Sequence, residues 1–219
     1  MKILLINPNS SPAVTQAMSK TAERCRREGL VIDTVCCQEA PSAIVTAYDE
    51  LLAGAAAVRL LQECEQDYDG AVIGCFADPG LAAARETLHI PVTGLYESSA
   101  LFARLQGERY SLLASGDEGD LSPWNRSIRQ LGDESHVASV RYLGSTVEAA
   151  LGATDEELCR CIDECRRRDG ANAVILGCAS FAGRGARLTQ LCGIPVIDGI
   201  AEAISLIKMM AEYNREVGK

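Results

Sequence analysis

Two of the ten cysteines in this 219-residue sequence, Cys75 and Cys178, stand in similar surroundings. Each follows a glycine at the end of an apolar run and precedes a turn of small residues that we expect to open a helix. Amide groups at the start of a helix carry partial positive charge, which favours a thiolate and lowers the pKa of a nearby thiol. The sequence therefore predicts two cysteines that give up and accept protons.

The residues after each cysteine are typical of a helix start. After Cys75, we expect Asp78 to be the N-cap and Pro79 to be the first helical residue. After Cys178, the expected cap is Ser180. A free cysteine is usually a small buried residue, and we assign that role to the other eight. They are Cys25, Cys36, Cys37, Cys64, Cys159, Cys161, Cys165 and Cys192.

A pair of proton-transfer groups is what racemisation next to a carbonyl requires. The planar intermediate must be deprotonated on one face and reprotonated on the other, so one group acts as base and one as acid. One cysteine begins as the thiolate and the other as the thiol, and the reverse reaction exchanges the roles. Negative charge develops on the carbonyl oxygen, where backbone amides of the cysteine turns could stabilise it. This chemistry needs no metal and no organic cofactor, and we expect none.

The two cysteines are also equivalent within an internal repeat. Three pairs of segments correspond: KILLINPNSS at 2–11 with RYSLLASGDE at 109–118, GAVIGCFADPG at 70–80 with NAVILGCASFAG at 172–183, and HIPVTG at 89–94 with GIPVIDG at 193–199. Equivalent loops of duplicated halves meet across a cleft from opposite sides. We therefore expect Cys75 and Cys178 to face one another.

The elements that must position these cysteines alternate between apolar runs and helical patterns, which favours an α/β fold with mostly parallel strands. The clearest helix lies at 154–170, where Thr154 and Glu157 form a capping box and Gly170 stands at the expected end. The expected strands are Ile3–Ile6, Val31–Cys36, Ala71–Ile73, Pro91–Thr93, Tyr110–Ala114, Val137–Tyr142, Ala173–Leu176 and Pro195–Ile197.

The repeat divides the chain into two pseudosymmetric halves, each a mostly parallel sheet flanked by helices, with the active site in the cleft between them. We expect residues 1–100 to form the first half, with Cys75, and residues 101–199 to form the second, with Cys178. The final helix at 200–219 is expected to pack back on the first half.

Composition limits the partners. A formal net charge of -9 and an isoelectric point near 4.8 argue against nucleic acid and against an anionic membrane surface. No segment has the apolar length of a membrane span and the N-terminus does not read as a signal peptide, so we expect a cytoplasmic protein. Without a C-x-x-C pair, and with His89 far from His136, a structural zinc site is not expected. A small-molecule substrate is expected, and a homo-oligomer is left open.

At these residues the chain resembles the hydantoin and allantoin racemase branch of the aspartate/glutamate racemase superfamily. The resemblance covers nearly the whole chain, and its elements occur in order: INPNSS at 6–11, PSAI followed by YDE within 41–50, CFADPGL at 75–81, LGCASFAG at 176–183 and PVIDG at 195–199. It implies a pseudosymmetric two-domain fold, a catalytic cysteine in each half, and substrate held between the halves without a cofactor. Carried onto this sequence, the catalytic pair is Cys75 and Cys178.

The resemblance also implies which residues bind the substrate. Asn7 and the backbone around Ala43 and Ile44 are expected to hold its polar ring, although Asn7 could equally cap the helix that follows Pro12. Backbone groups beside the cysteines complete the expected set, which is Gly74, Phe76, Gly177, Ala179 and Ser180.

Several residues depart from the family's pattern and put the substrate in question. Val45 stands where a glutamate is common, and Arg184 replaces an apolar residue. Tyr96 and Phe181 could line a pocket for an apolar or aromatic substituent, or belong to the core. The open alternatives are an aspartate or glutamate racemase, a cis/trans isomerase of the same superfamily, and a ligand-binding protein without catalysis. A decarboxylase of the superfamily needs only one catalytic cysteine, so the presence of both argues against it.

Overall fold

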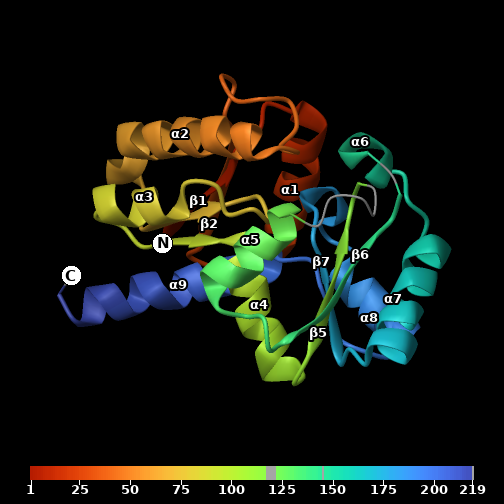
Figure 1. Ribbon diagram of the computed structural model, residues 1–219. Helices are drawn as coiled ribbons and strands as arrows, with labels where there is room; N and C mark the ends of the chain where they lie inside the picture. Colours follow the sequence, from red (N-terminus) through yellow and green to blue (C-terminus); the bar gives the residue numbers. More distant parts are fainter. Residues whose placement is uncertain (117–121, 145, 219) are drawn as a thin grey trace. The chain divides into compact units, whose positions relative to one another are not determined.

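The computed structural model describes residues 1–116, 122–144 and 146–218. The chain divides into two compact units, one formed by Met1–Ser98 with Ile200–Lys219 and the other by Ser99–Gly199 (Figure 1). Each unit contains a four-stranded sheet in which all paired strands are parallel. The predicted α/β class with two similar halves is confirmed.

In the first unit the strand order is β2-β1-β3-β4. Parallel neighbours require a crossover between strands, and helices provide it. The strands are β1 (Lys2–Asn7), β2 (Val31–Cys36), β3 (Gly70–Ile73) and β4 (Val92–Gly94). The helices are α1 (Pro12–Cys25), α2 (Ala47–Cys64), the 3-10 turn η1 (Glu65–Asp67), α3 (Leu81–Thr87) and α9 (Ile200–Glu216).

In the second unit the strand order is β6-β5-β7-β8, which repeats the order of the first unit strand for strand. The strands are β5 (Tyr110–Ala114), β6 (Val137–Tyr142), β7 (Ala173–Leu176) and β8 (Val196–Ile197). The helices are α5 (Ser122–Leu131), α6 (Val147–Ala150), α7 (Asp155–Asp169), the 3-10 turn η2 (Ala179–Phe181) and α8 (Gly185–Cys192). Helix α4 (Leu95–Gln106) begins in the first unit and ends in the second.

The strand boundaries match the expected apolar runs to within one residue at each end. Strands β4 and β8 begin one residue later than expected, after Pro91 and Pro195. A proline has no N–H and cannot donate to the ladder. Each proline carbonyl nevertheless accepts a bond from the central strand, Pro91 from Ala71 N and Pro195 from Val174 N.

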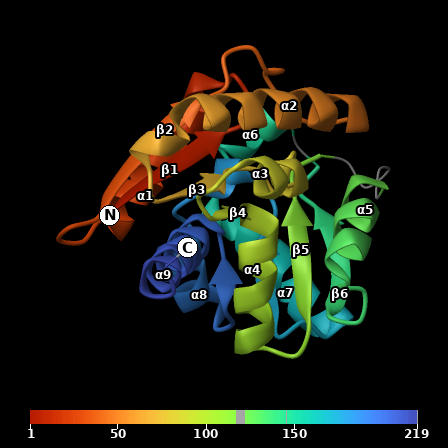
Figure 2. The same ribbon diagram turned by 90° about the vertical axis from the view of Figure 1, so that its left-hand side faces the viewer.

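Both faces of the first sheet are covered, because successive strand side chains point to opposite faces. Leu4 and Ile6 of β1 pack with α2 and α3, and Ile3 and Leu5 are equally buried. Helix α9 contacts α1, β3 and β4. Figure 2 shows α2 and α9 on opposite sides of the strands.

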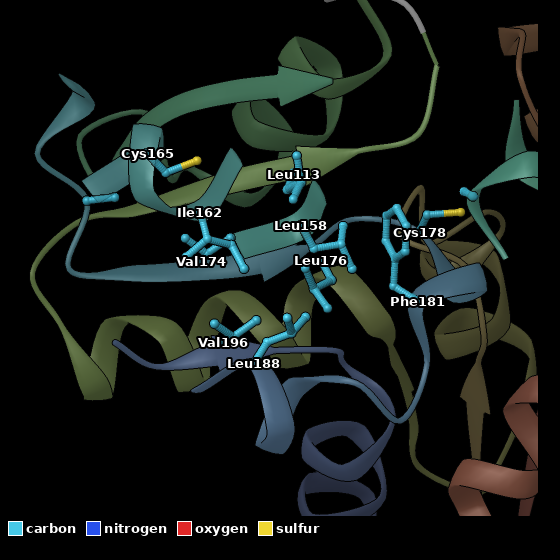
Figure 3. Close-up of a cluster of buried hydrophobic side chains, with 12 residues drawn as sticks. Leu113, Leu158, Ile162, Cys165, Val174, Leu176, Cys178, Phe181, Leu188 and Val196 are labelled. Atoms are coloured by element: carbon cyan, nitrogen blue, oxygen red, sulfur yellow. The ribbon is translucent and has the colours of Figure 1, made fainter. Parts of the chain in front are cut away.

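In the second unit, α7 and α8 pack against one face of the sheet. The buried cluster there includes Leu113, Val174 and Leu176 from the strands and Leu158 and Leu188 from the helices. Figure 3 shows this cluster, with Cys165 and Cys178 at its two ends. Helices α4 and α5 lie on the other side of the strands in Figure 1.

The predicted helix of residues 154–170 is confirmed in detail. Thr154 is the N-cap of α7, and its hydroxyl accepts a bond from Glu157 N while the Glu157 carboxylate accepts one from Thr154 N. Gly170 ends the helix in the left-handed conformation. The same device opens α2, where Thr46 and Asp49 form the box.

Candidate active site

Cys75 lies two residues after the end of the central strand β3, at the carboxyl edge of the first sheet. The Cys75 carbonyl accepts a hydrogen bond from Asp78 N at 3.0 Å, which closes a tight turn. Ala77 N lies 3.5 Å from Cys75 Sγ and points its hydrogen at the sulfur. The side chain is half-buried. A backbone N–H aimed at the sulfur favours a negative charge on it.

Gly74 lets the Cys75 turn approach strand β1 closely. Its N–H donates to Ile6 O at 2.7 Å. A Cβ added at Gly74 would lie 2.7 Å from the same carbonyl oxygen and would collide with the end of Met18. The glycine is therefore required by the close packing, since its φ is not in the left-handed region.

Cys178 occupies the equivalent place in the second unit, two residues after the end of β7. It is the residue before the 3-10 turn η2, and its carbonyl accepts a hydrogen bond from Phe181 N at 2.9 Å. Only 9% of Cys178 is exposed. In Figure 3 its sulfur points away from Leu158 and Leu176.

Gly177 matches Gly74 in position and in its hydrogen bond, which runs to Leu113 O at 2.8 Å. A Cβ at Gly177 would lie 2.6 Å from the indole ring of Trp124 on α5. Each cysteine turn is thus seated against the first strand of its unit through a glycine that has no room for a side chain.

The expected helix caps after the cysteines are wrong. Helix α3 begins at Leu81, with Gly80 rather than Asp78 as its N-cap, and Pro79 precedes it. Helix α8 begins at Gly185 after Arg184, and Ser180 lies inside η2. In both units several residues separate the cysteine from the first residue of the following α-helix. Neither cysteine therefore lies in the first turn of an α-helix.

Asp78 makes a different capping interaction, with a helix much later in the chain. Its two carboxylate oxygens accept hydrogen bonds from Tyr96 N at 3.0 Å and Glu97 N at 2.9 Å, in the first turn of α4. Burial raises the pKa of the Asp78 carboxyl to about 7, against the opposite effect of these two N–H donors. Asp78 has a φ of +45° and is the one non-glycine residue with positive φ among those the structure describes.

The remaining predicted substrate-binding residues lie at or near the carboxyl edges of the two sheets. Asn7 ends β1 and is fully buried. Its side-chain nitrogen donates to Asn9 Oδ1 and Thr15 Oγ1, both at 2.8 Å, so its two hydrogens brace the turn before α1. The N-cap of α1 is Ser11, not Asn7.

Ala43 and Ile44 lie half-buried in the loop between β2 and α2. This loop is tied to the turn after β1, because Ser10 N donates to Pro41 O at 3.0 Å. Val45 is 61% exposed. The first unit therefore places the turn after β1 and the loop after β2 next to each other. The structure leaves the substrate contacts of Asn7, Ala43 and Ile44 as predictions.

Beside the cysteines, Phe76, Ala179 and Ser180 are buried. Phe181 is fully buried in the second unit's core, and Tyr96 is only 2% exposed. The core interpretation of these two aromatic residues is therefore the one that the structure supports. Arg184 has a structural partner, because its guanidinium bonds to the Asp155 carboxylate and the Ala153 carbonyl at the start of α7.

Sequence reasoning missed one pair of thiols. Cys159 on α7 and Cys192 at the end of α8 lie with their sulfurs 3.0 Å apart. Both had been assigned only to packing, and their separation of 33 positions gives no sequence signal. Burial, together with the Cys159 sulfur, raises the pKa of Cys192 to about 12.

Among the described residues, no three His, Cys, Asp or Glu side chains form a group that could hold a metal ion. Over that same part of the chain, none of the helices has the length and apolar character needed to cross a membrane.

Known proteins resemble this chain in sequence and fold. The profile of the family described as Asp/Glu/Hydantoin racemase matches residues 3–207. A hydantoin racemase from Paenarthrobacter aurescens is 29% identical, over 100% of this chain and 94% of its own. The structure of an allantoin racemase from Klebsiella pneumoniae has a TM-score of 0.89 and 31% identity, over 100% of this chain and 89% of its own. An allantoin racemase from Pseudomonas fluorescens shares the fold, with a TM-score of 0.88 at 24% identity and coverage of 100% and 92%.

Proposed function

The chain belongs to the Asp/Glu/Hydantoin racemase family and is an isomerase of its hydantoin and allantoin racemase branch, and from this premise we propose a two-base mechanism carried by Cys75 and Cys178. In this mechanism each cysteine serves one face of a carbon next to a carbonyl. The resemblance noted in the sequence is confirmed at the level of the family and the branch.

The observation that carries the proposal is the equivalence of the two cysteines. Strands β3 and β7 hold the same place in two sheets of the same order, and each is followed by a glycine and a cysteine. Each glycine bonds to the first strand of its unit, through Ile6 O or Leu113 O. Racemisation requires one proton transfer on each face of the substrate carbon. Two thiols in equivalent positions of two similar units could each carry out one of these transfers.

The reaction proceeds in two proton transfers. The thiolate of one cysteine removes the proton from the substrate carbon, and the electron pair moves onto the neighbouring carbonyl oxygen. The thiol of the other cysteine then protonates the opposite face, which leaves the second cysteine as the thiolate. Backbone amides beside Phe76 and Ala179 would stabilise the oxygen's negative charge. No cofactor takes part.

The substrate is proposed to be a 5-substituted hydantoin or allantoin. This follows from the names of relatives that align over the whole chain at 29% and 31% identity. Both molecules carry an acidic carbon next to a ring carbonyl, where the proton transfers occur. The ring is proposed to lie against the turn of Asn7 and the loop of Ala43 and Ile44.

The test is proton exchange in heavy water. The purified protein, treated with a chelator, is incubated separately with both enantiomers of 5-substituted hydantoins, of allantoin, and of aspartate and glutamate. Deuterium uptake is followed by NMR and racemisation by optical rotation. Exchange and loss of rotation with a hydantoin or allantoin support the proposal. Exchange with only the amino acids would assign a different substrate class, and binding without any exchange would indicate a non-catalytic protein.

Single substitutions test the mechanism. Cys75→Ser and Cys178→Ser should each reduce racemisation by about 10²- to 10⁴-fold, the usual effect of losing one acid–base group. Cys25→Ser is the matched control, because a serine hydroxyl can also donate to Thr21 O within α1. Full racemisation in both directions by either single variant would refute the two-base mechanism.

A further inference from the structure

We infer that Asp78 and Asp198 are positioning residues that hold the two cysteine turns, each within its own unit. The inference rests on the proposed function, because it assigns these carboxylates a role in placing Cys75 and Cys178. Neither carboxylate is proposed to touch the substrate.

In the first unit, Asp78 connects the Cys75 turn to the first turn of α4. Its backbone N–H donates to the Cys75 carbonyl, while its carboxylate accepts from Tyr96 N and Glu97 N. One residue therefore bonds both to the cysteine's own peptide group and to a helix 18 positions later in the chain. Any movement of the carboxylate is transmitted to the turn through a single side chain.

The carboxylate of Asp78 fits a space that a glycine leaves open. A Cβ added at Gly94, the last residue of β4, would collide with the Asp78 carboxylate. Around this carboxylate lie Glu97, whose charge raises the pKa of Asp78, and Arg85, whose charge lowers it. Arg85 and Glu97 also form an ion pair with each other.

In each unit the segment after the cysteine meets the end of the last strand of the sheet, and we call this contact the junction. In the second unit the carboxylate at the junction comes from the strand side. Asp198 follows β8, and its Oδ2 accepts a hydrogen bond from Gly185 N at 2.9 Å. Gly185 is the first residue of α8, which follows the Cys178 turn. A Cβ at Gly185 would lie 2.8 Å from Val196 O and 3.0 Å from Asp198 Oδ2. Here the strand supplies the carboxylate and the cysteine side supplies the glycine.

This exchange of carboxylate and glycine between the units argues for a shared task. When the shared Ile-Pro-Val of the two repeats is aligned, Asp198 occupies the position of Gly94, so the two carboxylates reach the same junction from different residues. Capping alone does not require a buried carboxylate, because Thr46 and Thr154 cap α2 and α7 with exposed hydroxyls. Burial of a carboxylate costs free energy, so its presence at both junctions points to a role beyond helix capping.

The first test measures the two thiols directly and does not depend on any substrate. Asp78→Asn and Asp198→Asn are treated with iodoacetamide, and the alkylation rate of each cysteine is followed by peptide mass spectrometry. At Asp78, where both oxygens accept from backbone N–H groups, asparagine keeps the shape but turns its NH₂ group toward one of these donors. At Asp198 it removes the negative charge that faces Gly185 N. We expect the Cys75 rate to change by about fivefold in Asp78→Asn, the factor that one lost hydrogen bond is worth, with Cys178 unchanged. Asp198→Asn should give the reverse pattern.

Controls separate positioning from loss of folding. Glu86→Gln removes one charge from an exposed residue of α3 and should change neither rate. Gly94→Ala and Gly185→Ala displace the same junctions without altering either aspartate, and should reproduce the Cys75 and the Cys178 pattern respectively. The inference would be overturned if, in all four junction variants, both cysteines reacted at the rates of the unsubstituted protein. It would also be overturned if the rates of all cysteines changed together.

A second test uses the reaction. In heavy water, each enantiomer of an active substrate loses its proton to one of the two cysteines. Asp78→Asn should change the ratio of the two washout rates in one direction, and Asp198→Asn in the other, whereas general destabilisation lowers both rates together. If the unsubstituted protein exchanges no substrate proton, the proposed function fails, and the alkylation rates still decide whether the aspartates position the cysteines.

Discussion

Replacing Gly74 by alanine should displace the Cys75 turn from strand β1. The added Cβ would lie 2.7 Å from Ile6 O, about 0.7 Å closer than the 3.4 Å at which ordinary contact begins. Met18 can rotate its terminal methyl away, but the Ile6 carbonyl is part of the sheet and also accepts the Gly74 N–H bond. The strain must therefore move the backbone just before Cys75.

Overpacking of this kind costs about 1–3 kcal/mol of unfolding free energy. For a chain of this size, each kcal/mol lowers the melting temperature by about 2–4 °C. The effect on activity should be larger, because a displacement approaching 1 Å at a reacting group can reduce the rate by about 10²-fold. We therefore expect Gly74→Ala to remain folded at 25 °C and to lose at least about tenfold in racemisation rate.

The assay combines calorimetry with deuterium uptake by the substrate identified above. Gly152→Ala is the matched control, since its Cβ would meet only Ala149 O, at 3.5 Å, and its φ is not in the left-handed region. That variant should keep both its melting temperature and its activity. A Gly74→Ala protein with unchanged melting temperature and rate would refute the claim that close packing at this glycine seats the cysteine turn.

Three further predictions concern the second unit. The hydrogen bond from Arg184 lowers the pKa of Asp155, so this stabilisation is present above the carboxyl's ordinary pKa of 3.8 and is lost as the pH falls below it. Asp155→Asn should lower the melting temperature at pH 7. It should also make the decrease in melting temperature between pH 7 and pH 3 smaller than in the unsubstituted protein, and an unchanged decrease would contradict this prediction. Thr154→Ala should cost about 1 kcal/mol in urea unfolding through loss of the α7 cap, and a loss near zero would show that the cap is dispensable. Hydrogen peroxide should join Cys159 and Cys192, each losing one hydrogen atom while the peroxide becomes two waters. Because burial raises the pKa of Cys192, this should be faster at pH 9 than at pH 7, and mass spectrometry should find no such disulfide in Cys192→Ser.

Local patterns in the sequence predicted most of the fold. Strands β2, β5, β6 and β7 have the predicted bounds, and α7 begins and ends at its predicted caps. These features depend on residues within a few positions of each other: apolar runs of strand length, a capping box spanning four residues, and a glycine stop. The repeat added the expectation of two similar halves, and equivalent strands do take equivalent places in both units.

The caps after the cysteines could not be predicted in the same way. Aspartate is a residue type favoured at N-caps, but the carboxylate of Asp78 bonds to Tyr96 and Glu97 and not to the helix that follows it. Strand β4 and helix α4 bring these partners back to the turn. The Cys159 and Cys192 thiols meet only because α7 and α8 pack on the same face of one sheet. The sequence around Phe181 is compatible both with a pocket residue and with a core residue. In the structure Phe181 packs in the core cluster with Leu158 and Leu188.

By itself, then, the sequence determined the α/β class and the duplication, and its repeat singled out Cys75 and Cys178 as the proposed pair, since periodicity and repeated motifs are properties of the chain. The tertiary structure decided how each cysteine turn is held. Gly74 and Gly177 are required by contacts with Ile6 and Trp124, and such contacts depend on the distance between strands and helices far apart in the sequence. Hydrogen bonds and van der Waals contacts act over a few ångströms, so only folding determines which residues satisfy them.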